Sequence, residues 1–254
     1  MTTPTATPAQ LVTLRDRISR ILIGESCGRI GFRIGGAHIR PGGFTVIGMS
    51  IATATASRRG HGDRRSMGVA VRQMPDGVGA EYNTPSNTIR VPSADYGRTL
   101  DDRNGIVHEA THAIYDYFRI RATALEEEAG AYIAGAMYTR MEGGDHSAIS
   151  SPIFRIAWEI SADLVAPHRL MRPWTDAVSP AQQQRLVNAI AASPTYSATA
   201  LTCVVSSGTA TGNVMNAVGG ELTMTQKRIG LFKQLVPGLT RLGVIASDLS
   251  LDLL

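Results

Sequence analysis

The chain opens with a helical pattern. In "PAQLVTLRDRISRILIG", which starts at Pro8, apolar residues recur at the three- and four-residue spacing of one helix face, and Gly24 is suited to end the helix. Residues 1–8 are rich in Thr and Pro and contain few apolar residues, so we expect this segment to be disordered. The first predicted element is therefore a helix that begins close to Pro8.

The period changes in residues 29–92. Short runs of Ile, Val, Phe and Thr alternate here with glycines, which is typical of strands separated by turns. "PDG" at 75–77 and "TPSN" at 84–87 carry turn-forming residues. The pattern predicts a small, mostly antiparallel sheet.

After residue 98 the pattern is helical again. One predicted helix runs from an N-cap at Asp101 or Asp102 to about Phe118. A second runs from about Thr123 to Met141 and is followed by a pair of glycines that end it.

Three further helices are predicted, in residues 151–165, 179–193 and 223–236; the second begins with Ser-Pro, a favourable N-cap and first-turn pair. A sheet followed by helices favours an α+β domain. We expect a catalytic-sized core at 9–145 and a helical C-terminal part, 146–254, packed on the same domain.

Composition agrees with a globular protein. The chain has 254 residues, of which 43% are hydrophobic and 18% charged, enough to bury a sizeable core. The longest weakly polar stretch, 197–220, is interrupted by Ser, Thr and Asn, so no membrane span is expected. No basic start followed by an apolar run is visible, so we expect a cytoplasmic protein or one exported by a route independent of a signal peptide.

Cysteine and charge narrow the function classes. Cys27 and Cys203 lie far apart, so we expect small buried hydrophobes rather than a disulfide or a nucleophile. The net charge of +4 is concentrated in "SRRGHGDRRS", residues 57–66. No aromatic residue is interleaved there, so a solvated loop is favoured and a nucleic-acid partner is not expected, although nucleic-acid binding by this segment stays a rival hypothesis.

The sequence "HEATH" at 108–112 carries the strongest chemical signal. Residues four apart on a helix lie one above the other, so His108 and His112 can hold one metal ion together. Zinc in a hydrolytic site takes three protein ligands and leaves one position for water. Glu109 is then placed to act as general base on the metal-activated water.

The surrounding helix supports this interpretation. Its apolar positions form one stripe, and both histidines project away from it. We therefore expect the helix to pack with one face and to present the histidines on another. The alternative is a helix with two solvated histidines. The stripe consists of Ile106, Ala110, Ala113, Ile114 and Tyr117.

Three adjacent glutamates open the next predicted helix and offer a third ligand. The apolar stripe of that helix leaves Glu127 pointing away, with Glu126 and Glu128 on its two sides. Glu128 lies further along the returning helix, closer to the level of His112, and is the favoured ligand. The helix dipole alone would explain acidic residues at the other two positions. That stripe consists of Leu125, Ala129, Tyr132, Ile133 and Ala136.

These residues resemble the zincin metallopeptidases, and among them the gluzincin branch, in which HExxH is followed by Glu-Ala on the next helix. The likeness covers about residues 79–135. It implies that His108, His112 and Glu128 bind Zn²⁺, that Glu109 is the general base, and that the fold is zincin-like. "AEYNTPSNTIRVPSADYG" is also similar to the edge strand and connector that precede the active-site helix in small zincins, where an extended substrate pairs.

The chain departs from the gluzincin pattern near the third ligand. The gap between His112 and Glu128 is shorter than in thermolysin, and Tyr132 stands where that enzyme has an aspartate. Asp116, on the same helix face as the histidines, is instead a candidate for a hydrogen bond to a ligand histidine; an ordinary solvated carboxylate is the alternative. Residues that are candidates for stabilising an oxyanion, by type alone, are Tyr132, Tyr138, His146 and His168.

The sequence thus predicts a zinc metallopeptidase that hydrolyses a peptide bond in a protein or peptide substrate, either as a housekeeping protease or as a delivered, toxin-like effector. The alternative from another class is a non-catalytic binding or regulatory module on a zincin scaffold. Glu109 disfavours that alternative, because a structural zinc needs a fourth protein ligand rather than a base. Neither the substrate nor the oligomeric state is indicated.

Overall fold

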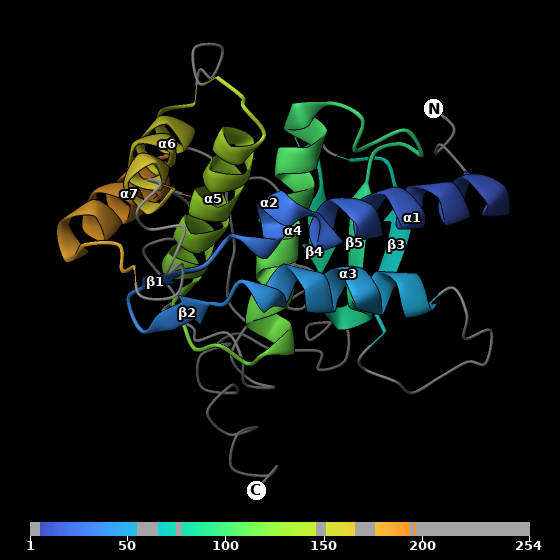
Figure 1. The fold of residues 1–254 in the computed structure, drawn as a ribbon, viewed down its shortest axis with the longest axis horizontal. Coiled ribbons are helices and arrows are strands. Elements are labelled where there is room, and N and C mark those ends of the chain that lie inside the picture. Colours follow the sequence, from blue (N-terminus) through green and yellow to red (C-terminus); the bar gives the residue numbers. More distant parts are fainter. Residues whose placement is uncertain are drawn as a thin grey trace, which may run out of the picture.

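The computed structural model describes residues 6–54, 66–74, 78–145, 151–165, 176–193 and 196. Several predicted features lie outside these ranges: the segment before residue 6, the basic segment at 57–65, the turn at 75–77, the stretch at 197–220, the helix at 223–236, His146, His168 and Cys203. Figure 1 shows the elements, which are, in chain order, α1 (Pro8–Ile23), α2 (Glu25–Gly28), β1 (Phe32–Ile34), β2 (Ala37–Ile39), α3 (Gly42–Ala54), β3 (Gly68–Val71), β4 (Glu81–Asn83), η1 (Thr84–Ser86), β5 (Thr88–Val91), α4 (Leu100–Tyr117), α5 (Ala124–Met141), α6 (Pro152–Leu164) and α7 (Pro180–Ala192).

Side-chain caps explain where the helices begin. α5, α6 and α7 start after Thr123, Ser151 and Ser179, whose side chains accept a hydrogen bond from the backbone of the first turn. These starts agree with the predicted ones. For α4 the prediction was wrong: the N-cap is Thr99, and Asp102 lies at the third helical position, where its carboxylate accepts the Thr99 N–H at 3.3 Å and completes a capping box.

Residues 42–54 form a helix, α3, where strands were predicted. β-branched residues and glycines suggested strands, but Phe44, Ile47 and Ile51 recur at helical spacing and are fully buried. α3 lies beside α1, and Gly48 permits the close approach, since a Cβ there would lie 3.0 Å from the Ser19 carbonyl oxygen. Tertiary packing outweighs local propensity in this segment.

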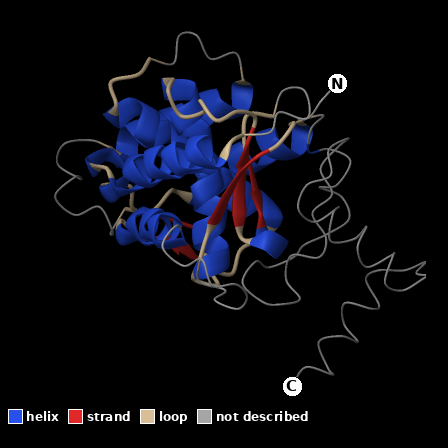
Figure 2. Cartoon of the chain, turned by 90° about the vertical axis from the view of Figure 1, so that its right-hand side faces the viewer, coloured by secondary structure: helices blue, strands red, loops and turns tan. Residues whose placement is uncertain are grey.

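The strands form two small sheets. β1 and β2 make an antiparallel pair, and the second sheet has the order β3-β5-β4, with β5 parallel to β3 and antiparallel to β4 (Figure 2). The predicted turn at 84–87 is confirmed: it contains η1, and Asn87 has the left-handed φ of 46°. Two of the three strand pairs are antiparallel, and the fold is α+β as expected.

α4 occupies the centre of the molecule. It contacts α3 and α1 on one side, α5 on another, and the strands β4 and β5 (Figure 1). α6 and α7 pack in turn against α5. One hydrophobic core runs through all these elements, so most faces of α4 are covered.

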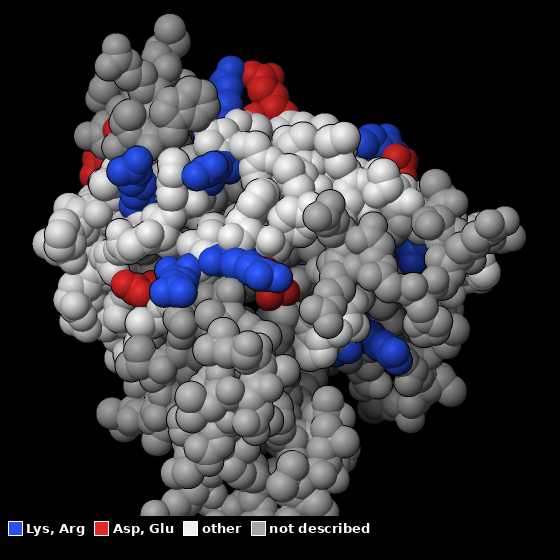
Figure 3. All heavy atoms as spheres, turned by 90° about the horizontal axis from the view of Figure 1, so that it is seen from below, with Lys and Arg blue, Asp and Glu red and all other residues white. Residues whose placement is uncertain are grey.

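The buried position of Cys27 agrees with one further expectation. Cys27 is buried in α2, where burial raises the pKa of its thiol well above the ordinary value. On the face drawn in Figure 3 the described cationic side chains are interspersed with acidic ones instead of forming one continuous basic patch. Within the described ranges, no helix combines the length and the apolar character that crossing a membrane requires.

Candidate metal centre

The pairing of α4 with α5 brings together His108, His112 and Glu128. The two histidine Nε2 atoms lie 3.3 Å apart. Glu128 faces both of them, with Oε2 3.4 Å from His108 Nε2 and Oε1 3.6 Å from His112 Nε2. With one ligand atom taken from each side chain, the three atoms all lie within 4.8 Å of one another.

These separations suit zinc. Ligand atoms around a tetrahedral Zn²⁺ with bonds of about 2.0–2.1 Å lie about 3.3–3.4 Å apart. The donor set of two imidazole nitrogens and one carboxylate is also the one that a hydrolytic zinc ion takes. The three residues fit a metal ion of this kind in the chemistry of their donor atoms, and no fourth His, Cys, Asp or Glu among the described residues groups with them.

The histidines are less exposed than the helix pattern suggested. His112 is only 7% exposed, and the side chains of His108 and Glu128 are partly buried. α5 packs over the face of α4 that carries the histidines, so the alternative of a helix with two solvated histidines is not what the structure shows. The centre is therefore a partly dry site, in which electrostatic interactions are stronger than at an open surface.

Glu127 is the functional neighbour that sequence reasoning missed. It is 6% exposed, and its Oε1 lies 3.0 Å from His112 Nδ1. A carboxylate on Nδ1 fixes the orientation and tautomer of the ring and leaves Nε2 free for a metal. Glu126, by contrast, completes the capping box of α5 with Thr123.

Glu109 lies on the side of α4 that faces the sheet. Its Oε2 accepts a hydrogen bond from the backbone N–H of Tyr82 in β4, at 2.6 Å. This bond holds the carboxylate beside His108, its neighbour in the helix. The Glu109 carboxylate thus has a fixed position within the electrostatic reach of His108, His112 and Glu128.

Asp116 has a different contact from the one expected. Its Oδ2 accepts a hydrogen bond from the hydroxyl of Tyr82, at 2.9 Å, so Tyr82 bonds to α4 at two points two turns apart. The contact with a ligand histidine that was expected of Asp116 is made by Glu127. Asp116 instead helps to join α4 to β4.

Two tyrosines border the centre. The ring of Tyr132 lies 4.8 Å from the ring of His108 in an edge-to-face arrangement. Its hydroxyl is 3.2 Å from the hydroxyl of Tyr196, which itself donates to Glu128 Oε2 at 3.2 Å. Tyr138, another oxyanion candidate, lies ten residues beyond Glu128 on α5, about 15 Å along the helix axis, and is not part of the centre.

The charges at the centre shift the pKa values of its members. Burial by itself lowers the pKa of His112, but Glu128 and the hydrogen bond with Glu127 raise it to about 10. Burial raises the pKa of Glu128, but His112 and His108 lower it to about 2. Burial also raises the pKa of Glu109, against the opposing effect of both histidines. Without a cation His112 therefore holds a proton near neutral pH, and a metal ion would compete with that proton.

Comparison with known proteins adds no relative: no family model matches the chain, and no curated protein or solved structure is significantly similar to it. The fold and the site themselves define an α+β protein with a His-His-Glu cluster between two antiparallel helices.

Proposed function

We propose that this protein is a zinc-dependent metallopeptidase with a zincin-like fold. The observation that carries the proposal is the convergence of His108 Nε2, His112 Nε2 and the Glu128 carboxylate at separations of 3.3–3.6 Å, with Glu109 oriented beside them. His108, His112 and Glu128 would hold Zn²⁺. A zinc ion in such a site acts as a Lewis acid and lowers the pKa of bound water.

The side chains of the centre divide the remaining work. Glu109 accepts a proton from the attacking water and returns it to the leaving amine. The Tyr82 N–H keeps its carboxylate in position for both transfers. Glu127 holds the His112 ring, and Tyr196 holds one oxygen of Glu128, so the ligands need little rearrangement.

A peptide substrate is favoured by the position of β4. Among the described strands β4 pairs with β5 alone, at the end of its sheet. The Tyr82 N–H of β4 bonds to Glu109, so Glu109 lies along the side of β4 that faces away from β5. A peptide that runs along this side of β4 would pass beside the Glu109 carboxylate.

The decisive experiment combines metal analysis with a proteolysis assay. Elemental mass spectrometry of the full chain, purified without added metal, should find about one zinc per chain, which His112→Ala loses and Glu109→Gln keeps. Hydrolysis of an unfolded protein and of a peptide library should fall by about 10²–10⁴-fold in Glu109→Gln. Glu25→Gln, an exposed glutamate in α2, is the matched control.

The outcomes distinguish a zinc metallopeptidase from a protein without a metal centre and from a non-catalytic module. Absence of zinc even after zinc is added would contradict the metal centre. Retained turnover in Glu109→Gln would mean that Glu109 is not the base. Zinc at full occupancy without hydrolysis of any substrate in the library would favour the non-catalytic binding module instead.

A further inference from the structure

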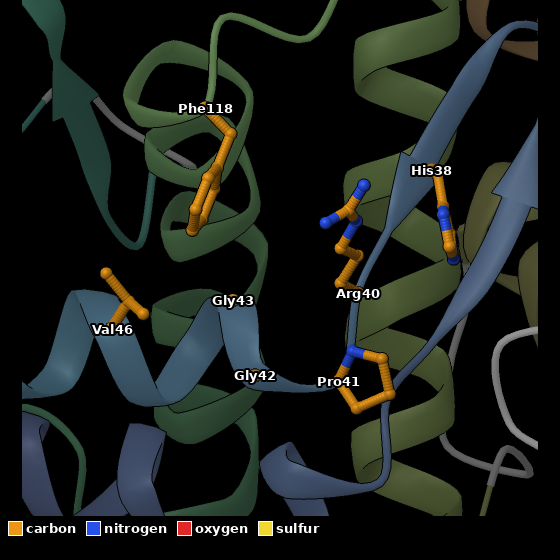
Figure 4. A pocket seen from close by; sticks show the side chains of 7 residues that line it. All are labelled: His38, Arg40, Pro41, Gly42, Gly43, Val46 and Phe118. Atoms are coloured by element: carbon orange, nitrogen blue, oxygen red, sulfur yellow. The ribbon is translucent and has the colours of Figure 1, made fainter.

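A second concave site lies away from the metal centre. It is a pocket of about 460 Å³ between β2, the start of α3 and the residue that follows α4. Figure 4 shows Arg40 and Phe118 on its two sides, both extending toward the space between them. No member of the His-His-Glu cluster lines it. Its lining residues are His38, Arg40, Pro41, Gly42, Gly43, Val46 and Phe118.

Much of the pocket wall is apolar. Phe118 is 46% exposed, although large aromatic side chains are usually covered. Its ring faces Pro41 and Val46 across the pocket (Figure 4). Gly43 closes the floor, where a Cβ would lie 3.1 Å from Ile114. The walls therefore suit the apolar body of a small molecule, and the volume lies in the range of small-ligand sites.

The rim of the pocket is cationic. Along β1 and β2 the apolar residues are buried, so Arg33, His38 and Arg40 share the opposite face of the hairpin. Arg33 pairs with His38 in the strand register. Neither arginine side chain forms an ion pair within the part of the chain that the structure describes. This face thus carries positive charge without a described acidic partner.

His38 lines the pocket beside Arg40. Burial, Arg33 and Arg40 lower the pKa of its ring, so the positive charge at this rim comes from the arginines. α3 begins at Gly42, so the positive end of its dipole points to the same place.

We propose that this pocket binds a small organic carboxylate, with the carboxylate held by Arg40 and the apolar body packed between Pro41, Val46 and Phe118. The free acid and the C-terminal carboxylate of a peptide with an apolar last residue share this chemistry. The proposal does not depend on the zinc centre.

Titration of the full chain with 3-phenylpropionate, followed by calorimetry or NMR, tests the proposal. The acid should bind at least about tenfold more tightly than the neutral 3-phenylpropanamide, because the arginine contact is charge-assisted. Arg40→Gln should lower the affinity for the acid by about tenfold or more. Arg155→Gln, which changes an exposed arginine on α6, should leave that affinity unchanged. A tripeptide Ala-Ala-Phe with a free or an amidated end distinguishes the peptide source from the free acid.

A second variant fills the pocket. No atom lies within 4 Å of where a Cβ would stand at Gly42, so a side chain can start there, and Gly42→Leu should fill the pocket and abolish binding. Gly28→Leu is the control, since Gly28 is equally unobstructed and does not line the pocket. Equal binding of acid and amide, wild-type affinity in folded Arg40→Gln, or no binding of any of these ligands at millimolar concentration would overturn the proposal.

Discussion

Three consecutive glutamates in α5 have identical side chains but make different contacts. Successive residues are rotated by about 100°, so Glu126, Glu127 and Glu128 face different neighbours. Glu126 caps the helix and accepts a hydrogen bond from Gln183. Glu127 bonds to His112, and Glu128 faces both histidines of the cluster. Only Glu128 offers a ligand atom to the centre.

This division predicts unequal effects of the same substitution. Glu127→Gln should weaken zinc affinity by about tenfold or more, because it removes the negative charge that orients and polarises a ligand imidazole. Glu126→Gln should leave the affinity within about twofold, because glutamine also completes a capping box. Competition with a chromophoric chelator measures both. Equal affinities in the two variants would show that Glu127 does not act through His112.

Sequence reasoning found His108, Glu109 and His112 and also chose Glu128 on the next helix, but it did not find the side chains that hold these residues in place. The motif formed by His108, Glu109 and His112 can be recognised in the sequence, because its geometry depends on the spacing along a single helix. Glu127 bonds to a residue 15 positions away, and its role depends on how α4 and α5 pack. Tyr196 reaches Glu128 across 68 positions, and nothing in its local sequence signals that contact.

At the scale of elements, the distance between α4 and α5 decides whether the ligands meet. Tyr115 on α4 packs directly against Gly130 on α5, where an added Cβ would lie 2.6 Å from the tyrosine hydroxyl oxygen. Tyr115 is fully buried, and its hydroxyl has no hydrogen-bond partner among the described residues. A glycine two residues after Glu128 therefore permits the close approach of the two helices.

Gly130→Ala should lower the free energy of unfolding by about 1–2 kcal/mol, because overpacking outweighs the gain in helix propensity. Tyr115→Phe should be neutral or stabilising, since the hydroxyl that it removes is unsatisfied. The double variant should recover most of the loss. Denaturant titrations of the four proteins give the coupling energy, and strictly additive effects would refute the contact as the cause.

The elements themselves were predictable to different degrees. Periodic apolar residues and Ser or Thr caps predict the helices α4, α5, α6 and α7, because both features act locally. The residue before α3 is Pro41, whose side chain has no hydrogen-bond acceptor, and α3 is rich in β-branched residues and glycine, so it was mistaken for strands. Its helical form depends on packing against α1. The membership of the zincin fold class stays a prediction.

At the scale of the whole molecule, burial of the cluster couples its charges to stability. The pKa of Glu128 falls from 4.5 to about 2, so its contribution is present above pH 4.5 and is lost as the pH falls toward 2. The pKa of His112 rises from 6.5 to about 10, so its contribution is complete below pH 6.5 and is lost as the pH rises toward 10. Without a cation, Glu128 and His112 therefore stabilise the fold most between pH 4.5 and pH 6.5.

Zinc should change the alkaline side of this profile. Because the metal requires neutral His112, binding displaces a proton at neutral pH, and the stabilisation that zinc gives should grow as the pH rises from about 5.5 to 8. Thermal unfolding with zinc or with a chelator at several pH values measures the difference in Tm. Calorimetry in buffers of different ionisation enthalpy counts the protons released. His112→Ala should lose both effects, and a zinc-induced shift in Tm that is equal at every pH would mean that the metal binds somewhere other than this cluster.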